Sequence, residues 1–194
     1  MKRVHWHWTA GAPGMIQIEA DSYHEIIQPD GTVQRGQFPV EANIPPLRPG
    51  QYAAHTLNAN SHAIGIACDA MAGAQERPLD WGSNPLTEAQ VEAMLDRTAY
   101  YCRRYGIPVS RQTTLSHAEV QANLGIAQRN KWDFMVLPGM TRVDDPVVVG
   151  DELRRRLTLK LKALDAPPVL TAPPPFAGLV IAVTAALRRI FGKG

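Results

Sequence analysis

The first hydrophobic pattern along the chain has period two. Residues 4–8 read Val-His-Trp-His-Trp, so apolar and imidazole side chains alternate. Because successive side chains of a strand point to opposite faces of a sheet, the pattern predicts a strand with one apolar face and one face carrying His5 and His7. A second strand is expected at residues 63–68, a short apolar run interrupted only by Gly65, which suits a buried central position.

Turn and loop signals divide the stretch between these two strands. Residues 22–27 followed by Pro29-Asp30-Gly31-Thr32-Val33 predict a hairpin, because Pro-Asp-Gly fixes one backbone angle and tolerates a positive one. Residues 38–52 contain four prolines and are expected to form a loop that leads to His55. After the second strand, residues 72–86 are rich in Gly, Pro, Asp and Asn and predict a long surface loop.

Period 3.6 replaces period two in the second half of the chain. Thr87 and Gln90 fit a capping box, apolar residues recur on one face, and Gly106 ends the predicted helix. Residues 107–115 are expected to return as a short strand. A final helix is predicted from about residue 151 to residue 164, where leucines form an apolar stripe beside basic residues.

Composition places the chain among soluble globular proteins. It has 194 residues, 45% hydrophobic and 20% charged, which argues for one main domain and against disorder or a multi-span membrane protein. The net charge of +2 is too small to indicate a nucleic-acid partner. Cys68 and Cys102 are too few for a disulfide framework and are expected to be buried thiols.

The C-terminal residues differ in composition from the rest. Residues 166–175 are expected to form a proline-rich linker after a catalytic domain of residues 1–165. Residues 176–194 then predict an apolar and basic helix, too short for a confident membrane span. Membrane contact through residues 176–191 and packing against the domain or a sister chain fit this tail equally well. No apolar signal sequence follows Lys2 and Arg3, so we expect synthesis in the cytoplasm.

The six histidines form no local metal motif, because the chain has neither HExxH nor a cysteine-rich finger. A catalytic zinc takes three protein ligands and leaves a fourth position for water. Any such site must therefore be assembled from distant segments. Five segments suggest how: His7-Trp8-Thr9-Ala10-Gly11, Tyr23-His24 before Pro29-Asp30-Gly31-Thr32, His55 with Asn60 before Ile64-Gly65-Ile66, Ser116-His117-Ala118-Glu119-Val120, and Gln128-Arg129-Asn130-Lys131-Trp132-Asp133.

In this order, from about residue 4 to about residue 139, the five segments resemble the motifs of type-2 N-acetylmuramoyl-L-alanine amidases. The resemblance implies an α/β fold with a mixed central sheet flanked by helices. It also implies one Zn²⁺ and hydrolysis of the amide between N-acetylmuramic acid and L-alanine in peptidoglycan. Carried over to matching positions, the metal ligands are His7, His117 and Asp133.

The resemblance also implies roles around the metal. Tyr23 and Lys131 are expected to be catalytic, as donors to the oxyanion or carriers of the proton, and His55 and Asn60 to contact substrate. Some members carry a glutamate general base after Ile-Gly-Ile, where this chain has Ala67. We therefore expect Tyr23 and Lys131 to handle the proton, or zinc hydroxide to need no side-chain base. Of the remaining histidines, His5 and His62 are expected to be structural or exposed, and His24 follows Tyr23 on the opposite face of the strand, so none of the three is a candidate site residue.

Elementary chemistry agrees with this ligand set. Two neutral imidazoles and one carboxylate leave a net +1 on a zinc site, and such an ion lowers the pKa of its water to roughly 7. If the segment is extended, Lys131 shares a face with Asp133, two residues away. One well-placed donor to the oxyanion contributes on the order of 3 kcal/mol.

We therefore expect a phage or prophage endolysin that acts on the cell wall, in the periplasm, after release. A cytoplasmic amidase that recycles muropeptides is the alternative among enzymes. A peptidoglycan-binding module without catalysis would be expected to lack a zinc ligand, and all three positions are filled here. An interaction protein anchored by the tail is a further alternative.

Overall fold

A computed structural model describes residues 1–166, and its centre is a five-stranded mixed sheet. The strands lie in the order β3-β2-β4-β1-β5. Strand β1 runs parallel to β4 and β5, β2 runs parallel to β4, and only β3 is antiparallel to its neighbour. The strands are β1 (Arg3–Trp8), β2 (Glu25–Ile27), β3 (Val33–Arg35), β4 (Ala63–Cys68) and β5 (Thr114–Ser116). The expected fold class is confirmed, and so is the hairpin.

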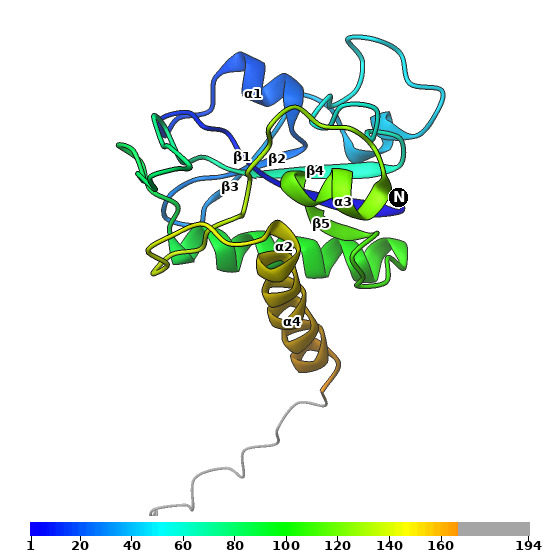
Figure 1. The fold of residues 1–194 in the computed structure, drawn as a ribbon. Coiled ribbons are helices and arrows are strands. Elements are labelled where there is room, and N and C mark those ends of the chain that lie inside the picture. Colours follow the sequence, from blue (N-terminus) through cyan, green and yellow to red (C-terminus); the bar gives the residue numbers. More distant parts are fainter. Residues whose placement is uncertain (167–194) are drawn as a thin grey trace, which may run out of the picture.

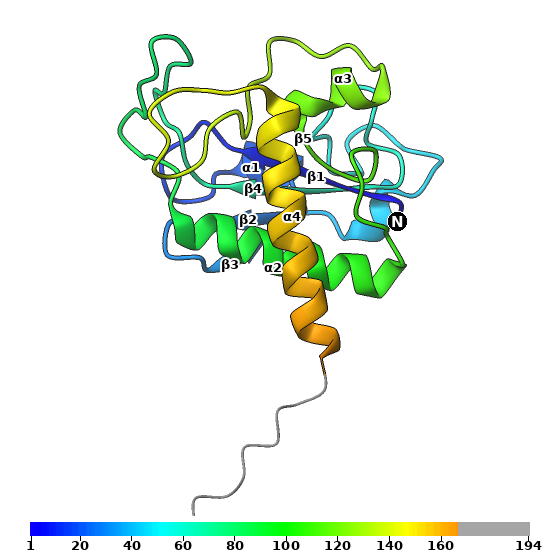
Figure 2. The ribbon, with the colours of Figure 1, turned by 60° about the horizontal axis from the view of Figure 1, so that its bottom comes forward.

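Helices cover both faces of the sheet. In Figures 1 and 2, α2 and α4 lie on one face, with α4 crossing α2, and α1 lies on the opposite side. The helical elements are α1 (Gln17–Ser22), η1 (Val40–Asn43), α2 (Glu88–Tyr105), η2 (His117–Glu119), α3 (Val120–Leu124) and α4 (Pro146–Asp165). The longest two therefore enclose the main apolar core between themselves and the sheet.

Strand β1 has the two different faces that its alternation predicts. Val4, Trp6 and Trp8 belong to the core under α2, and the Trp6 indole N–H donates to Thr98 Oγ1 at 2.9 Å. His5 and His7 are also completely buried, but they face the other side of the sheet. A strand with both faces buried thus supplies packing on one side and imidazoles on the other.

The start of α2 ties the sheet to the helix layer. The predicted capping box is present: Thr87 Oγ1 accepts from the Gln90 N–H at 3.1 Å, and Gln90 Oε1 accepts from the Thr87 N–H at 3.0 Å. The Gln90 side chain also donates to the backbone carbonyls of Ile27 and Asp69. Gly106 ends the helix in the left-handed region, at φ 64°, where glycine has no steric penalty.

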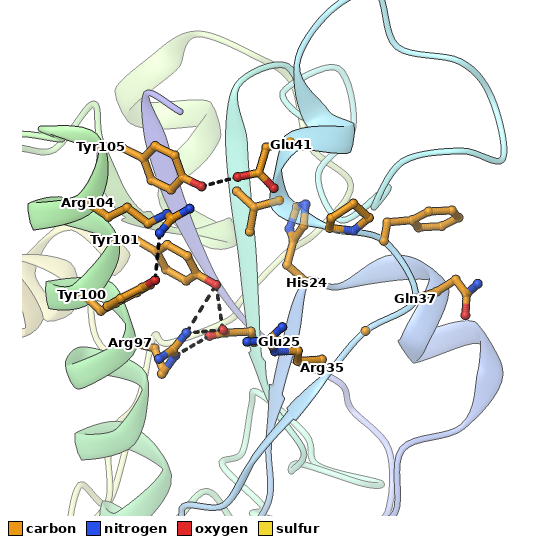
Figure 3. Close-up of a pocket in the computed structure, with 14 residues that line it drawn as sticks. His24, Glu25, Arg35, Gln37, Glu41, Arg97, Tyr100, Tyr101, Arg104 and Tyr105 are labelled. Carbon is orange, nitrogen blue, oxygen red and sulfur yellow. Dashed lines mark hydrogen bonds and ion pairs between the residues drawn. The ribbon is translucent and has the colours of Figure 1, made fainter.

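The middle of α2 is joined to β2 by a part-buried ion pair (Figure 3). Arg97 donates two hydrogen bonds to the carboxylate of Glu25, at 2.8 and 2.5 Å, and the Tyr101 hydroxyl donates a third at 2.6 Å. One turn further, the Tyr105 hydroxyl donates to Glu41 of η1 at 2.6 Å. These contacts line a surface cavity of about 470 Å³ and leave both of its carboxylates satisfied.

Three details differ from the sequence expectations. Of residues 107–115, only Thr114 and Leu115 join a strand, because Pro108 lacks an N–H and residues 110–113 form a turn. Helix α4 begins earlier than predicted, where Asp145 caps the N–H groups of Val147 and Val148. The short helix α1 was not predicted from the sequence.

The predicted linker of residues 166–175, apart from Ala166, and the predicted helix of residues 176–194 lie outside the described residues. Membrane contact through residues 176–191 falls there too. Among residues 1–166, no helix combines the length and the apolar character needed to cross a membrane.

Candidate metal centre

Three ligand-type side chains meet at one end of the parallel strands. His7 is the next-to-last residue of β1, His117 follows β5 directly, and Asp133 comes from the loop after α3. Because β1 and β5 are parallel neighbours, with Trp6 paired to Ser116, their carboxyl ends meet at one edge of the sheet. All three side chains are buried, with His7 0%, His117 5% and Asp133 6% exposed. The structure therefore brings the three predicted ligands together.

The distances suit one tetrahedral zinc ion. His7 Nδ1 lies 3.1 Å from His117 Nδ1 and 3.8 Å from Asp133 Oδ1. Zinc bonds of 2.0–2.1 Å at tetrahedral angles separate two ligand atoms by about 3.4 Å. One ligand atom from each residue falls within 4.8 Å of the others. The two nitrogens and one oxygen are also the donor types that catalytic zinc takes, so the residues fit the metal.

Burial places these groups in the protonation states that a cation needs. Burial lowers the pKa of His7 well below its ordinary value of 6.5, helped by the neighbouring imidazoles, and lowers the pKa of His117. The two rings are therefore neutral at neutral pH and have lone pairs to donate. Burial raises the pKa of Asp133, against the pull of His117 and Lys131. A buried carboxylate of this kind is stabilised by a nearby cation.

Neighbouring groups fix the orientation of the two rings. His117 Nε2 lies 2.9 Å from Gln128 Oε1, an acceptor that puts the proton on Nε2 and leaves Nδ1 free. His7 Nε2 faces His55 Nδ1 at 3.3 Å and Thr56 Oγ1 at 3.4 Å. Asp133 Oδ1 accepts the Trp8 N–H at 3.3 Å. Outer partners thus turn Nδ1 of both imidazoles toward the same point.

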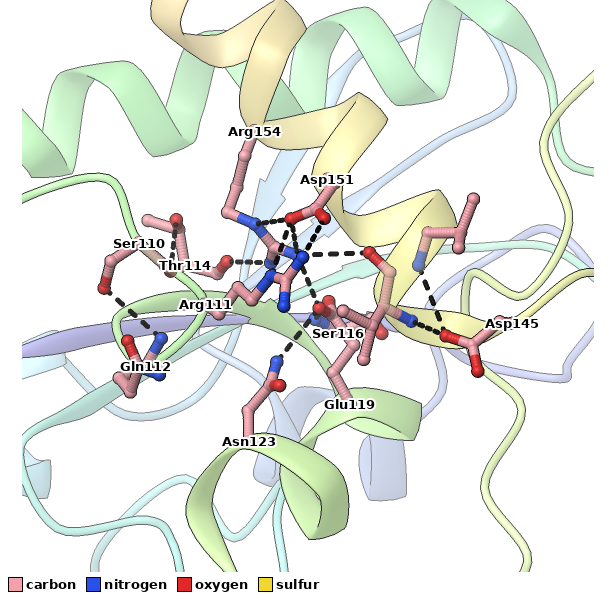
Figure 4. Close-up of polar contacts among 12 residues, drawn as sticks. Ser110, Arg111, Gln112, Thr114, Ser116, Glu119, Asn123, Asp145, Asp151 and Arg154 are labelled. Atoms are coloured by element: carbon pink, nitrogen blue, oxygen red, sulfur yellow. Dashed lines mark hydrogen bonds and ion pairs between the residues drawn. The ribbon is translucent and has the colours of Figure 1, made fainter.

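The turn that carries His117 is held from its other side by α4 (Figure 4). Glu119 is fully buried, and its carboxylate accepts from Arg154 at 2.7 Å and from the Ser116 N–H at 2.8 Å. Arg154 also donates to the Thr114 carbonyl at 2.8 Å. Gly150 lets the helix approach, because a Cβ there would clash with the Glu119 carboxylate. Helix α4 therefore supports β5 and the metal ligand that follows it.

The two predicted catalytic residues both lie near the ligands. The Tyr23 ring lies 5.2 Å from the His7 ring, centroid to centroid. Burial and the negative charge of Asp133 raise the pKa of Tyr23, which keeps the phenol protonated and able to donate a hydrogen bond. Lys131 lines a cavity of about 410 Å³ together with His117, and its charge acts on both histidine ligands.

His55 and Asn60 line the same cavity but are themselves mostly buried, at 6% and 8% exposure. The His55 ring lies against Gly65, where a Cβ would come within 2.5 Å of His55 Cγ. Asn60 Oδ1 accepts the Thr56 N–H at 2.8 Å. Ala67 is paired with His7 in the sheet and is fully buried, so no carboxylate stands at that position.

The sequence did not single out Thr56, and it did not make His5 or His24 a candidate site residue. Both histidines are buried: His5 contacts Thr56, and His24 bridges Asn43 and the Gly65 N–H. His5, His7 and His55 also form a second group with metal-ligand spacing. The period-two pattern of β1 could have indicated that His5 is buried beside His7.

Comparison with known proteins gives a family model that matches most of the chain. The model of the N-acetylmuramoyl-L-alanine amidase family matches residues 1–139. The match includes all three candidate ligands and stops before α4. No curated protein matches the chain.

Three solved structures are similar to this chain. The N-acetylmuramoyl-L-alanine amidase LysC from Clostridium intestinale URNW is 19% identical, with a TM-score of 0.47, and the match covers 81% of this chain and 85% of that one. The amidase AmiD from E. coli, complexed with anhydro-N-acetylmuramic acid-L-Ala-D-gamma-Glu-L-Lys, is 18% identical over 61% and 48%, with a TM-score of 0.43. Drosophila peptidoglycan recognition protein SA is 15% identical over 73% of each chain, with a TM-score of 0.38.

Proposed function

Since the chain belongs to the N-acetylmuramoyl-L-alanine amidase family, we propose that it is a zinc-dependent hydrolase of peptidoglycan. The bond cut is the amide between the lactyl group of N-acetylmuramic acid and L-alanine. The observation that carries the proposal is the convergence of His7, His117 and Asp133, with His7 Nδ1 3.1 and 3.8 Å from the other two ligand atoms.

The ligands and the residues around them have separate roles in the reaction. A zinc ion held by His7, His117 and Asp133 would polarise the scissile carbonyl and acidify the attacking water. The Tyr23 phenol, kept protonated by burial, donates to the oxygen that becomes negative. Lys131 places a positive charge at the rim of the same cavity and stabilises that oxyanion. Because Ala67 occupies the position of a glutamate base, no side chain there takes the proton of the water, which leaves to solvent, and the Tyr23 phenol or the Lys131 ammonium supplies the proton that the departing L-alanine amine requires.

Metal analysis paired with turnover of purified sacculi tests the proposal. The wild type is expected to hold one zinc per chain and to release peptides with a new L-alanine amino terminus, without new reducing sugar ends. His117→Ala is expected to lose both the zinc and the activity. Sacculi left intact by the zinc-loaded wild type would instead indicate a binding module without catalysis.

We further propose a phage or prophage endolysin, made in the cytoplasm and released to the cell wall. The proposal is supported by residues 176–194, whose apolar and basic composition suits contact with anionic lipid during release. Higher activity on intact sacculi than on small soluble muropeptides is expected. The opposite preference would favour the recycling amidase.

The tail can be tested separately from catalysis. A chain ending at residue 166 keeps every described element and is expected to cleave isolated sacculi at the wild-type rate. It should no longer bind vesicles that contain anionic lipid. Equal vesicle binding by both chains would rule out membrane contact through residues 176–191.

A further inference from the structure

The Thr56 hydroxyl lies at the centre of three buried imidazoles. Its Oγ1 is 2.8 Å from His55 Nδ1, 2.9 Å from His5 Nδ1 and 3.4 Å from His7 Nε2. Thr56 itself is 1% exposed, so water does not compete for these contacts. An oxygen atom of the protein therefore lies within hydrogen-bonding distance of one nitrogen of each of these three rings.

A hydroxyl has the hydrogen-bonding capacity that this position requires. It can donate one hydrogen bond and accept two. Burial holds the pKa of His5 at about 3 and lowers the pKa of His55 well below 6.5, so both rings are neutral. With one short contact donated by the hydroxyl and the other accepted, a lone pair remains for His7 Nε2–H. The three nitrogens that face the hydroxyl are then satisfied, while Nε2 of His5 and Nε2 of His55 have no hydrogen-bond partner among the described residues.

This pattern determines which nitrogen of His7 carries the proton. A neutral imidazole has one N–H, and a proton on Nε2 leaves the Nδ1 lone pair directed at His117 and Asp133. The Thr56 loop is itself fixed, because its N–H donates to Asn60 Oδ1 at 2.8 Å and its carbonyl accepts from Ala59. The acceptor for His7 is thus held rigidly.

We propose that Thr56 is a positioning residue for the metal site: its hydroxyl, shared with His5 and His55, holds His7 in the tautomer and orientation that bind zinc. The proposal rests on the proposed zinc site. It also assigns the trio of His5, His7 and His55 to positioning rather than to a second metal ion. Substituting a residue that hydrogen-bonds a metal ligand in this way typically weakens metal binding about 10- to 100-fold.

The test is the zinc dissociation constant of substituted chains, measured by competition with a chromophoric chelator. Thr56→Val keeps the size of the side chain but removes the hydroxyl, and it is expected to weaken zinc binding about 10- to 100-fold. Thr56→Ser keeps the hydroxyl and should stay within about 3-fold of the wild type. Thr56→Ala serves in place of valine if the valine variant does not fold.

Thr98→Val is the matched control on the other face of β1. Its hydroxyl is equally buried and accepts the Trp6 N–H, so its loss should lower the melting temperature without changing zinc affinity. Wild-type affinity in both Thr56→Val and Thr56→Ala would overturn the proposal, as would equal losses in Thr56→Ser or Thr98→Val. Two zinc ions per wild-type chain would overturn the assignment of the trio.

The outcomes separate this proposal from the proposed function. If the wild type binds one zinc and cleaves sacculi, and the Thr56 variants bind zinc as tightly, only the proposed role of Thr56 is wrong. If the wild type binds no zinc, both the proposed function and the proposed role of Thr56 are wrong.

Discussion

His117 and Glu119 stand two residues apart in one short turn, yet they belong to two buried polar clusters of opposite kinds. The carboxylate of Glu119 meets Arg154, the Ser116 N–H and Asn123, so its charge and its lone pairs are satisfied by the protein (Figure 4). His117 faces His7 and Asp133, where two neutral rings and a carboxylate converge.

The comparison teaches how to tell a structural cluster from a functional one. Burial of a charge is costly unless partners compensate it, and the Glu119–Arg154 cluster has such partners. The cluster of His7, His117 and Asp133 instead offers two imidazole lone pairs and a carboxylate, the donors that a catalytic zinc takes. Substitutions in the first cluster should therefore affect folding, and substitutions in the second should affect metal binding and chemistry.

The largest effect is expected from His7→Ala. Losing a ligand should abolish zinc binding and lower kcat/KM on sacculi by about 10³-fold or more, because several kcal/mol of transition-state stabilisation come from the metal. In chelator, His7→Ala should unfold at close to the temperature of the wild type, because neither protein then holds zinc. His62→Ala, at a half-buried position outside the cluster, is the control and should retain zinc. If His7→Ala melted far below the zinc-free wild type, the metal cluster would also be needed for folding, and the two clusters would not differ in role.

Arg154→Met tests the complete cluster. It leaves the buried Glu119 carboxylate without its cation and should lower the free energy of unfolding by about 3–5 kcal/mol, measured by urea denaturation. Arg155→Met is the matched control on the same helix, because the Arg155–Glu152 pair is exposed and contributes less than about 1 kcal/mol. Equal effects of the two substitutions would contradict the structural role of Arg154.

Lys131→Met probes chemistry without removing a ligand. We expect kcat to fall by about 10²–10³-fold with zinc still bound, the usual cost of one oxyanion donor. Lys131→Arg should recover part of the activity, and Lys162→Met, at an exposed position, should have no effect. Loss of zinc from Lys131→Met would assign the residue to metal binding instead.

Acid should lower the stability of the fold through its buried imidazoles, among them His5 and His24. Burial lowers the pKa of His5 to about 3 and that of His24 to about 4, both below the 6.5 of an unfolded chain. Below pH 6.5 these imidazoles therefore bind protons in the unfolded chain but not in the folded chain. The free energy of unfolding consequently decreases as the pH is lowered. Each imidazole should cost about 1–2 kcal/mol between pH 6.5 and 5. Denaturation in chelator at several pH values measures this slope, which His24→Gln should reduce. The same slope in His24→Gln and wild type would contradict the assignment.

Sequence patterns predicted the elements whose signals are local. The alternation in β1 and the cap residues Thr87 and Gln90 specify structure within a few residues, and both predictions are confirmed. Helix α1 carries no such signal, because Ile16 and Ile18 are exposed and its cap is formed by Glu19, whose side chain accepts the Ile16 N–H. Its apolar residues do not mark a buried face.

The residues of the site also fall into those that the sequence predicted and those that it did not. His7, His117 and Asp133 stand in recognisable motifs, so their meeting could be predicted from the resemblance. The contact of Thr56 with His5 and His7 could not, because it joins residues 49 to 51 positions apart through a loop without regular structure. Arg154 lies outside the residues that the family model matches, and no local pattern in the sequence shows that it supports the turn that carries His117.

Anomalous diffraction at the zinc edge, from crystals of the zinc-loaded protein, tests the central claim most directly. The account predicts one anomalous peak per chain, about 2.0–2.2 Å from His7 Nδ1, His117 Nδ1 and an oxygen of Asp133. A peak among His5, His7 and His55, or the absence of any peak at these three ligands, would contradict it.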